Sequence, residues 1–164
     1  MSVIPNVSTK HSLLIRVSEE DMSTLREIFE DVETKRFLPE LYELLDAPAG
    51  LQKFVSTFEL YSQNGEGYLW GIYCDDTLLG FVAVIDLSYN PSLFYATHPA
   101  YRSHGYMKGA ISAVLDYIGK RSLCHNISTD VYKANSTSIH ILQQLGFSVY
   151  KEDCDKVYLS KVLA

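Results

Sequence analysis

The sequence lacks the features that mark disulfide-rich, secreted and membrane proteins. It holds three cysteines, Cys74, Cys124 and Cys154, which form no C-x-x-C pair and favour reduced thiols over a disulfide framework. No apolar run approaches the roughly 18 residues of a membrane span. Residues 1–10 show neither the basic start nor the apolar stretch of a signal peptide. We therefore expect a cytoplasmic protein with no membrane partner.

Basic residues are also scarce. Lys and Arg number 14 against 20 Asp and Glu, a formal net charge of −6, whereas binding to a phosphate backbone needs clustered Lys and Arg. This balance argues against a nucleic-acid partner. The sequence has no H-E-x-x-H and no G-x-S-x-G, and its histidines are not spaced as metal ligands. Neither a metal site nor a covalent nucleophile is therefore expected.

What the sequence does contain is the apolar pattern of one folded domain. Its 164 residues are 47% hydrophobic and 12% aromatic, enough to bury a core. β-Branched and aromatic runs predict strands at 13–17, 68–74, 78–87, 92–97, 126–132, 147–151 and 156–162. Helical spacing predicts helices after Ser18, in two pieces between 34 and 64, from 105 to 119 and from 135 to 146. We expect a single mixed α/β domain over 1–164, in which 1–11 form a flexible leader.

Residues 95–110 are the most informative stretch, a strand and a short loop followed by a helix that starts at Gly105. The first amides of a helix have no partner within the helix, and the helix dipole adds positive charge there. A glycine lets a ligand approach the backbone closely, so the loop can cradle a pyrophosphate, with Arg102 as a counter-charge. An ordinary loop and helix start would show the same residues.

This loop resembles the acyl-CoA signature of the GNAT acetyltransferases. The signature has Arg or Gln, two variable residues, Gly, one variable residue, and then Gly or Ala. The sequence Arg102-Ser103-His104-Gly105-Tyr106-Met107 fits it except at the last place. A Gly-Tyr-Met run is familiar in the branch that acetylates the N-termini of ribosomal proteins. The departure at Met107 therefore points toward that branch.

A second segment strengthens the resemblance. Residues 135–147 begin with Asn135, carry Ser138 three residues later and end in Leu-Gly-Phe, which is similar to the late pattern of the same family. An N-capped helix with a glycine stop would use the same residues for structural reasons alone. A plain helix does not explain why the segment lies one strand after the pyrophosphate loop, where the family keeps it.

The resemblance implies a mixed α/β (α+β) fold, a mostly antiparallel sheet of six to seven strands with helices on both faces. The fourth strand, here 92–97, would splay from the fifth, here 126–132, and the gap would take the pantetheine arm of the co-substrate acetyl-CoA. No metal is implied. Backbone groups at Ala96, Thr97 and His98 would pair with that arm. The pyrophosphate would contact Arg102, Ser103, His104, Gly105, Tyr106 and Met107, and the thioester would lie beside Asn135 and Ser138.

The usual catalytic groups of the family are only partly present. Many members carry an acidic residue early in the fourth strand as general base, and residues 92–95 have none. His98, whose intrinsic pKa suits proton transfer, and Asp86 are the remaining candidates. Leu142 stands where a common pattern has the Tyr proton donor. Ser138 offers a hydroxyl nearby, although capping of the helix competes for it.

The resemblance therefore implies an enzyme that acetylates a primary amine, either a protein N-terminus or a small amine such as a polyamine or an aminoglycoside. The missing acid and Tyr favour a second hypothesis, a non-catalytic acyl-CoA-binding or regulatory module. A pure interaction protein on the same fold is a third, and a homodimer stays open. The acidic residues Glu30, Asp31, Glu40 and Glu43 are either solvated helix faces or part of the substrate entrance.

Overall fold

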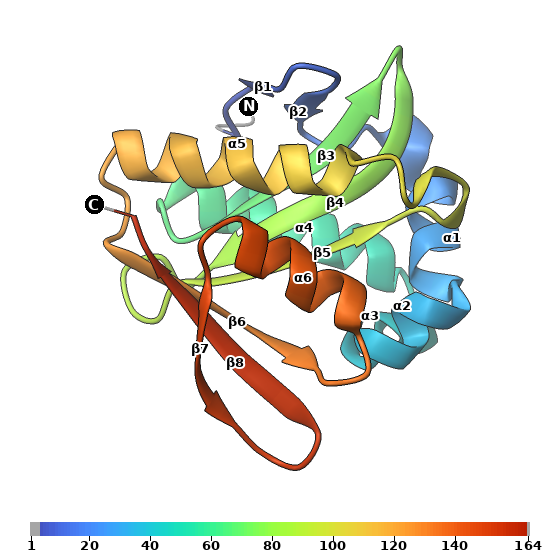
Figure 1. Ribbon diagram of the computed structural model, residues 1–164. Helices are drawn as coiled ribbons and strands as arrows, with labels where there is room; N and C mark the ends of the chain where they lie inside the picture. The colour runs from blue at the N-terminus through green and yellow to red at the C-terminus, as the bar shows by residue number, and fades with distance from the viewer. Residues whose placement is uncertain (1–3, 164) are drawn as a thin grey trace.

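The computed structural model describes residues 4–163, which form one mixed sheet covered by helices on both faces (Figure 1). Within these residues the sheet has eight strands in the order β1-β2-β3-β4-β5-β6-β8-β7. They are β1 (Val7–Ser8), β2 (Leu13–Ile15), β3 (Tyr68–Cys74), β4 (Thr77–Ile85), β5 (Ser92–Thr97), β6 (Asn126–Tyr132), β7 (Ser148–Glu152) and β8 (Lys156–Val162). The expected mixed fold is confirmed, but the expected six to seven strands are corrected to eight.

The helices fall where the sequence predicts them, with one further break. They are α1 (Met22–Glu30), α2 (Val32–Phe37), α3 (Pro39–Glu43), α4 (Gly50–Gln63), α5 (Tyr106–Lys120) and α6 (Ser136–Gln144). The break lies between α2 and α3, where Pro39 is the first residue of a helix. Proline has no amide to donate and disfavours a helical residue before it, so Leu38 leaves the helical region and one helix becomes two.

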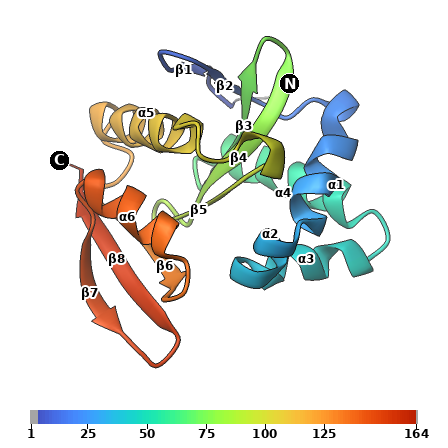
Figure 2. The ribbon, with the colours of Figure 1, turned by 45° about the vertical axis from the view of Figure 1, so that its right-hand side comes forward.

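The core lies on both sides of the sheet. Helices α5 and α6 cover one face, and α1, α3 and α4 pack on the other (Figure 1, Figure 2). Strand β4 alternates between the two layers: Val82 and Val84 join the α5 side, whereas Phe81 and Ala83 join the α1 side. The ring of Phe81 lies 5.9 Å from that of Phe29 on α1. Burial on both faces explains why the sequence of β4 is almost continuously apolar.

The first strand lies inside the segment expected to be a flexible leader. Val7 pairs with Leu14 of β2 and is buried. The indole Nε1 of Trp70 donates a hydrogen bond of 2.8 Å to the carbonyl of Pro5. From residue 4 to residue 11 the segment is therefore attached to the sheet edge. The expectation for residues 1–3 lies outside the described residues.

Strands β5 and β6 diverge. Six residues of β5 pair antiparallel with β4, whereas β5 and β6 run parallel and pair only as Ser92 with Ser128. Beyond that point β6, β8 and β7 turn away from the rest of the sheet (Figure 2). The predicted splay between the strands at 92–97 and 126–132 is confirmed. None of the helices in residues 4–163 is long and apolar enough to cross a membrane.

Candidate active site

A cleft of about 400 Å³ opens where β5 and β6 diverge. One wall is β5 and the loop that follows it, and the start of α5 closes one end. The start of α6 forms the opposite wall, and α2 lies at the rim. The lining residues are 33, 34, 36–38, 95–97, 101–103, 105–108, 134–138 and 141. The two sequence segments that carry the family resemblance therefore meet in one cavity.

The exposed edge of β5 supplies backbone hydrogen-bonding groups to this cleft. In an antiparallel pair both backbone groups of a residue point the same way, and the direction alternates along the strand. The carbonyl of Leu93 accepts from the Thr129 hydroxyl of β6 at 2.8 Å, whereas the amide of His98 donates to Leu79 of β4 at 2.8 Å. Tyr95 and Thr97 share the orientation of Leu93. Their backbone groups therefore face the gap, where the described residues offer no strand partner.

The same alternation refines the sequence expectation. Of the three residues whose backbone the resemblance implied, only Thr97 turns its backbone groups to the cleft. Those of Ala96 and His98 face β4, although Ala96 still lines the cavity. Tyr95 is the other residue whose backbone groups face the cleft, because the backbone groups of every second residue in a strand point to the same side.

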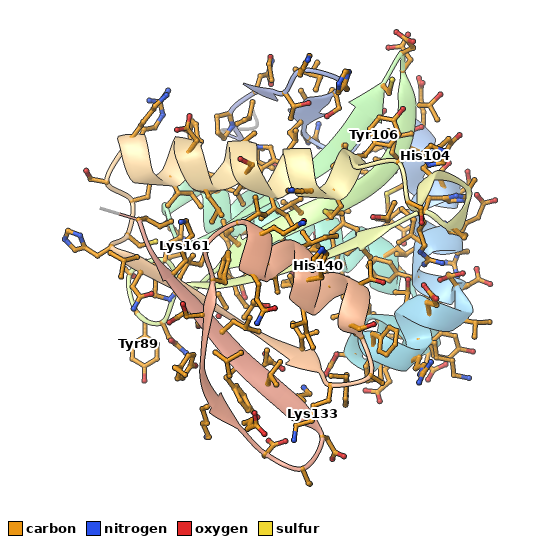
Figure 3. The ribbon with its side chains drawn as sticks, viewed as in Figure 1. Tyr89, His104, Tyr106, Lys133, His140 and Lys161 are labelled. Atoms are coloured by element: carbon orange, nitrogen blue, oxygen red, sulfur yellow. The ribbon has the colours of Figure 1, made fainter. Side chains whose placement is uncertain are left out.

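The start of α5 supplies a second set of free amides. Gly105 caps the helix with a φ of 80°, and Ser103 before it also has a positive φ of 66°. Tyr106 and Met107 of the first turn line the cleft, and the first amides of a helix have no partner within the helix. His104 and Tyr106 lie together at this end of α5 (Figure 3). The described loop therefore has the shape that an anion site at a helix start requires.

Met107 stands where the signature has Gly or Ala, and its position explains why a large residue is tolerated. Its side chain is 7% exposed and packs in the core beneath α5. Met107 also counts among the residues that line the cleft.

Arg102 is held by carboxylates at the rim. Its guanidinium donates to Asp31 and lies 3.3 Å from Glu33, both at the start of α2. Asp31 also accepts from the amides of Glu33 and Thr34 and so caps α2. Burial alone would raise the pKa of Asp31, but the hydrogen bonds and the charge of Arg102 hold it below its ordinary value. The Arg102 side chain thus joins the loop to α2 rather than standing free as a counter-charge.

Two hydroxyl groups meet inside the cleft. The phenol of Tyr95 on β5 is hydrogen-bonded to Ser138 Oγ in the first turn of α6. Ser138 is 7% exposed, and its amide donates to the Asn135 side chain at 3.3 Å. Burial raises the pKa of Tyr95 to about 12, and the bond to Ser138 offsets this only in part. The pair places one polar, uncharged group on each side of the gap.

A family model settles the relationship. The GNAT acetyltransferase domain model matches residues 12–148. The chain belongs to the GNAT family. A curated relative, an uncharacterized protein of Mycobacterium leprae, is 30% identical over 97 residues, which are 56% of this chain. The chain spans only 26% of the length of that relative.

Solved GNAT structures share the whole architecture. A ribosomal L7/L12 alpha-N-protein acetyltransferase in complex with coenzyme A matches with a TM-score of 0.83 at 12% identity, over 97% of this chain and 98% of its own. The ribosomal-protein-S5-alanine acetyltransferase of Vibrio fischeri gives a TM-score of 0.78 at 16% identity, over 97% of both chains. At these identities the likeness establishes the fold.

In this GNAT protein neither residue considered as general base lines the cleft. The His98 ring accepts at Nδ1 from the amide of Ala100 at 3.1 Å, and its Nε2 lies 3.0 Å from Glu27. Since Nδ1 accepts, a neutral ring carries its proton on Nε2 and donates it to Glu27. The lone pair that a base would use is therefore already bonded.

Asp86 lies at the other end of β5. It follows β4 with a φ of 55° and opens the turn in which its carbonyl accepts from Tyr89 at 3.0 Å. Figure 3 shows Tyr89 on the side of the molecule opposite His104. The structure does not bring Asp86 to the cleft.

Sequence reasoning about this GNAT protein missed Tyr95. Residues 92–95 stand out in the sequence for their lack of a carboxylate, and a tyrosine in a strand is usually a core residue with a polar tip. Tyr95 lies two residues after Leu93 and therefore faces the same side of β5. Its contact with Ser138 follows only from the packing of α6 beside β5. Tyr95 and Ser138 are 43 residues apart, so no local pattern in the sequence predicts their contact.

Proposed function

We propose that this GNAT protein transfers the acetyl group of acetyl-CoA to a primary amine. The observation that carries the proposal is the open edge of β5 beside the free amides of α5. A pantetheine arm contains two amides, which can pair with the backbone groups of Tyr95 and Thr97 as a strand would. A pyrophosphate would then meet the first turn of α5, from Gly105 onward. The coenzyme A bound by the ribosomal L7/L12 relative supports the same co-substrate.

Acetyl transfer at this site needs no covalent enzyme intermediate. The amine nitrogen attacks the thioester carbonyl carbon, and the electron pair of the C–S bond leaves with sulfur. Holding the two reactants together in a narrow cleft supplies much of the rate acceleration. A role for His98 or Asp86 as base, expected from the sequence, would require either side chain to leave its present contacts. We propose instead that the ammonium of the acceptor loses its proton to water in the cleft.

We propose a protein N-terminus as the acceptor, with a small amine as the second candidate. The two ribosomal-protein acetyltransferases support the first choice because they share the fold over almost the whole chain. Residues of α2 also line the cleft, and we propose that the part of the acceptor beyond its amine lies against them.

The first test is binding. We expect the thermal midpoint of the protein to rise with CoA and with acetyl-CoA, because a ligand of the folded state stabilises it by mass action. The midpoint can be followed by differential scanning fluorimetry. No rise at millimolar CoA would contradict co-substrate binding while leaving the fold intact.

The second test is turnover, followed as CoA release. We expect activity within a panel of peptides with varied first residues, polyamines and aminoglycosides, and the best acceptor of the panel identifies the class. Tight acetyl-CoA binding without CoA release for any amine would favour the regulatory module, which the absent carboxylate in 92–95 and the occupied His98 lone pair make the second candidate.

A further inference from the structure

We propose that Tyr95 is a positioning residue, which aims the Ser138 hydroxyl at the CoA sulfur and strengthens its hydrogen bond to the leaving thiolate. This inference rests on the proposed acetyl transfer. Ser138 was a candidate proton donor from the sequence, whereas no role was expected for Tyr95. The two side chains come from elements that are 43 residues apart.

The surroundings fix both partners. Tyr95 lies opposite Val82 of β4, and its ring packs against the core beneath α5 and α6. Ser138 lies in the first turn of α6, where Asn135 caps the helix through the Ser138 amide. Neither hydroxyl is held by a flexible loop, because one belongs to a strand and the other to a capped helix. The hydrogen bond between them therefore has a fixed direction in the cleft.

The acidities of the two groups set the direction of the hydrogen bond. A phenol has an ordinary pKa of about 10, far below that of an aliphatic hydroxyl, so Tyr95 is the better donor and Ser138 Oγ accepts. The single proton of Ser138 is then free to point into the cleft. Hydrogen bonds in a chain polarise one another, so donation by Tyr95 makes Ser138 a stronger donor. The raised pKa of Tyr95 keeps the phenol protonated at neutral pH.

The step balances without an added reactant. The amine nitrogen forms a bond to the carbonyl carbon, the C–S bond breaks, and sulfur takes the electron pair. Ser138 stabilises the charge on sulfur by hydrogen bonding, and Tyr95 keeps its own proton. The ammonium first gives one proton to water, and the attacking nitrogen gives up a second as the amide forms. The thiolate takes up one proton from water, and the other stays in solution. The products are an amide and the CoA thiol.

The decisive variant is Tyr95→Phe in the full chain, which keeps the ring and removes the hydroxyl. With the best acceptor from the turnover panel, we expect kcat to fall about tenfold, less than the roughly 10²-fold typical for loss of a direct donor. The Kd of CoA should stay within about twofold, since the backbone of Tyr95 is unchanged. We expect Ser138→Ala to lose about 10²-fold in kcat, and Tyr95→Phe to cost nothing more in that background.

A second acetyl donor distinguishes a role in catalysis from a structural role, because a purely structural defect would lower kcat equally with both acetyl donors. The acetyl thioester of 4-nitrothiophenol releases a thiolate that needs little stabilisation. We therefore expect the effect of Tyr95→Phe on kcat to disappear with this donor. Tyr73→Phe is the matched control: its hydroxyl donates to Asp21 at 2.8 Å and accepts from the Ser18 amide at 3.1 Å. That variant should lower the thermal midpoint and leave kcat unchanged.

The results separate the two proposals. If the wild type releases no CoA with any amine, the proposed function fails and this inference fails with it. If the wild type is active and Tyr95→Phe matches it in kcat, or loses equally with both donors, the role of Tyr95 is overturned while the activity stands. Should Tyr95→Phe fail to fold, an unchanged kcat in Ser138→Ala overturns the inference, because it removes the donor that Tyr95 positions.

Discussion

Gly105 starts α5 in a left-handed conformation, and no heavy atom beyond its neighbours in the chain lies within 4 Å of the position that a Cβ would take. The requirement for glycine is therefore conformational. Gly105→Ala should lower the free energy of unfolding by about 1 kcal/mol and should also weaken CoA binding, because the helix start shifts or the new methyl group meets the ligand. Denaturant unfolding and calorimetric titration measure the two effects.

Gly65 is the matched control for that change. It has a φ of 71°, equally open surroundings and a place after α4, away from the lining of the cleft. Gly65→Ala should carry a similar loss of stability and no loss of CoA affinity. Equal affinities in the two variants would contradict a pyrophosphate site at Gly105.

At this scale the sequence indicates residues whose role is local. Gly105 and Asn135 were predictable because the start of a helix and its N-cap depend on a few residues that are adjacent in the sequence. Arg102 was placed correctly in the loop, but its partner Asp31 lies 71 residues away, and the interaction was not predictable. Asp31 had been left open between a solvated face and a substrate entrance, and it proves to be a helix cap that binds Arg102.

At the scale of elements, the contact between Arg102 and Asp31 holds the loop after β5 against helix α2. Asp31→Asn should keep the cap, because Asn caps helices as well as Asp does, while the charge that holds Arg102 is lost. We expect the free energy of unfolding at neutral pH to fall by about 1.5 kcal/mol, the low end for a hydrogen bond to a charged group, because Arg102 is partly exposed. Urea unfolding of both proteins measures the difference.

The pH dependence of that difference follows from the lowered pKa of Asp31. A carboxyl whose pKa is depressed by folding stabilises the protein fully above its unfolded pKa, about 3.9 for Asp, and loses this effect as the pH falls through the folded value. The difference in the free energy of unfolding between the wild type and Asp31→Asn should be constant near neutral pH and become smaller in acid. Glu59→Gln, which frees the half-exposed Arg16, should cost less. An advantage that persists in strong acid would contradict the assignment.

Most elements were predictable because they carry strong periodic signals. The helix of α5 shows its apolar stripe, and the strands β3 to β6 show their aromatic and β-branched runs. The strand β1 was missed since two residues have no period, and it forms because Leu14 and Trp70 hold the chain. Its position depends on tertiary contacts, as does the orientation of the β5 backbone toward the gap.

At the scale of the whole molecule, the sheet consists of two units, β1 to β5 and β6 to β8. They are joined by a single residue pair, Ser92 with Ser128. A ligand in the gap would complete the missing ladder. We expect acetyl-CoA to slow hydrogen exchange at the amides of Tyr95 and Thr97, whereas that of His98, already bonded to β4, changes little. Amide exchange followed by NMR resolves these neighbours. Protection of Tyr95 and Thr97 without ligand would contradict the open edge.

The same junction predicts an order of folding events. The strands β3, β4 and β5 pair with their neighbours in sequence, and β6, β8 and β7 form a second unit within 126–162. Local pairings of this kind close short loops and form quickly, whereas contacts across a long crossover form slowly. We therefore expect the seam between the units to be the last part of the chain to assemble. A ligand that recognises only the finished seam should prolong the lifetime of the folded chain without hastening its formation.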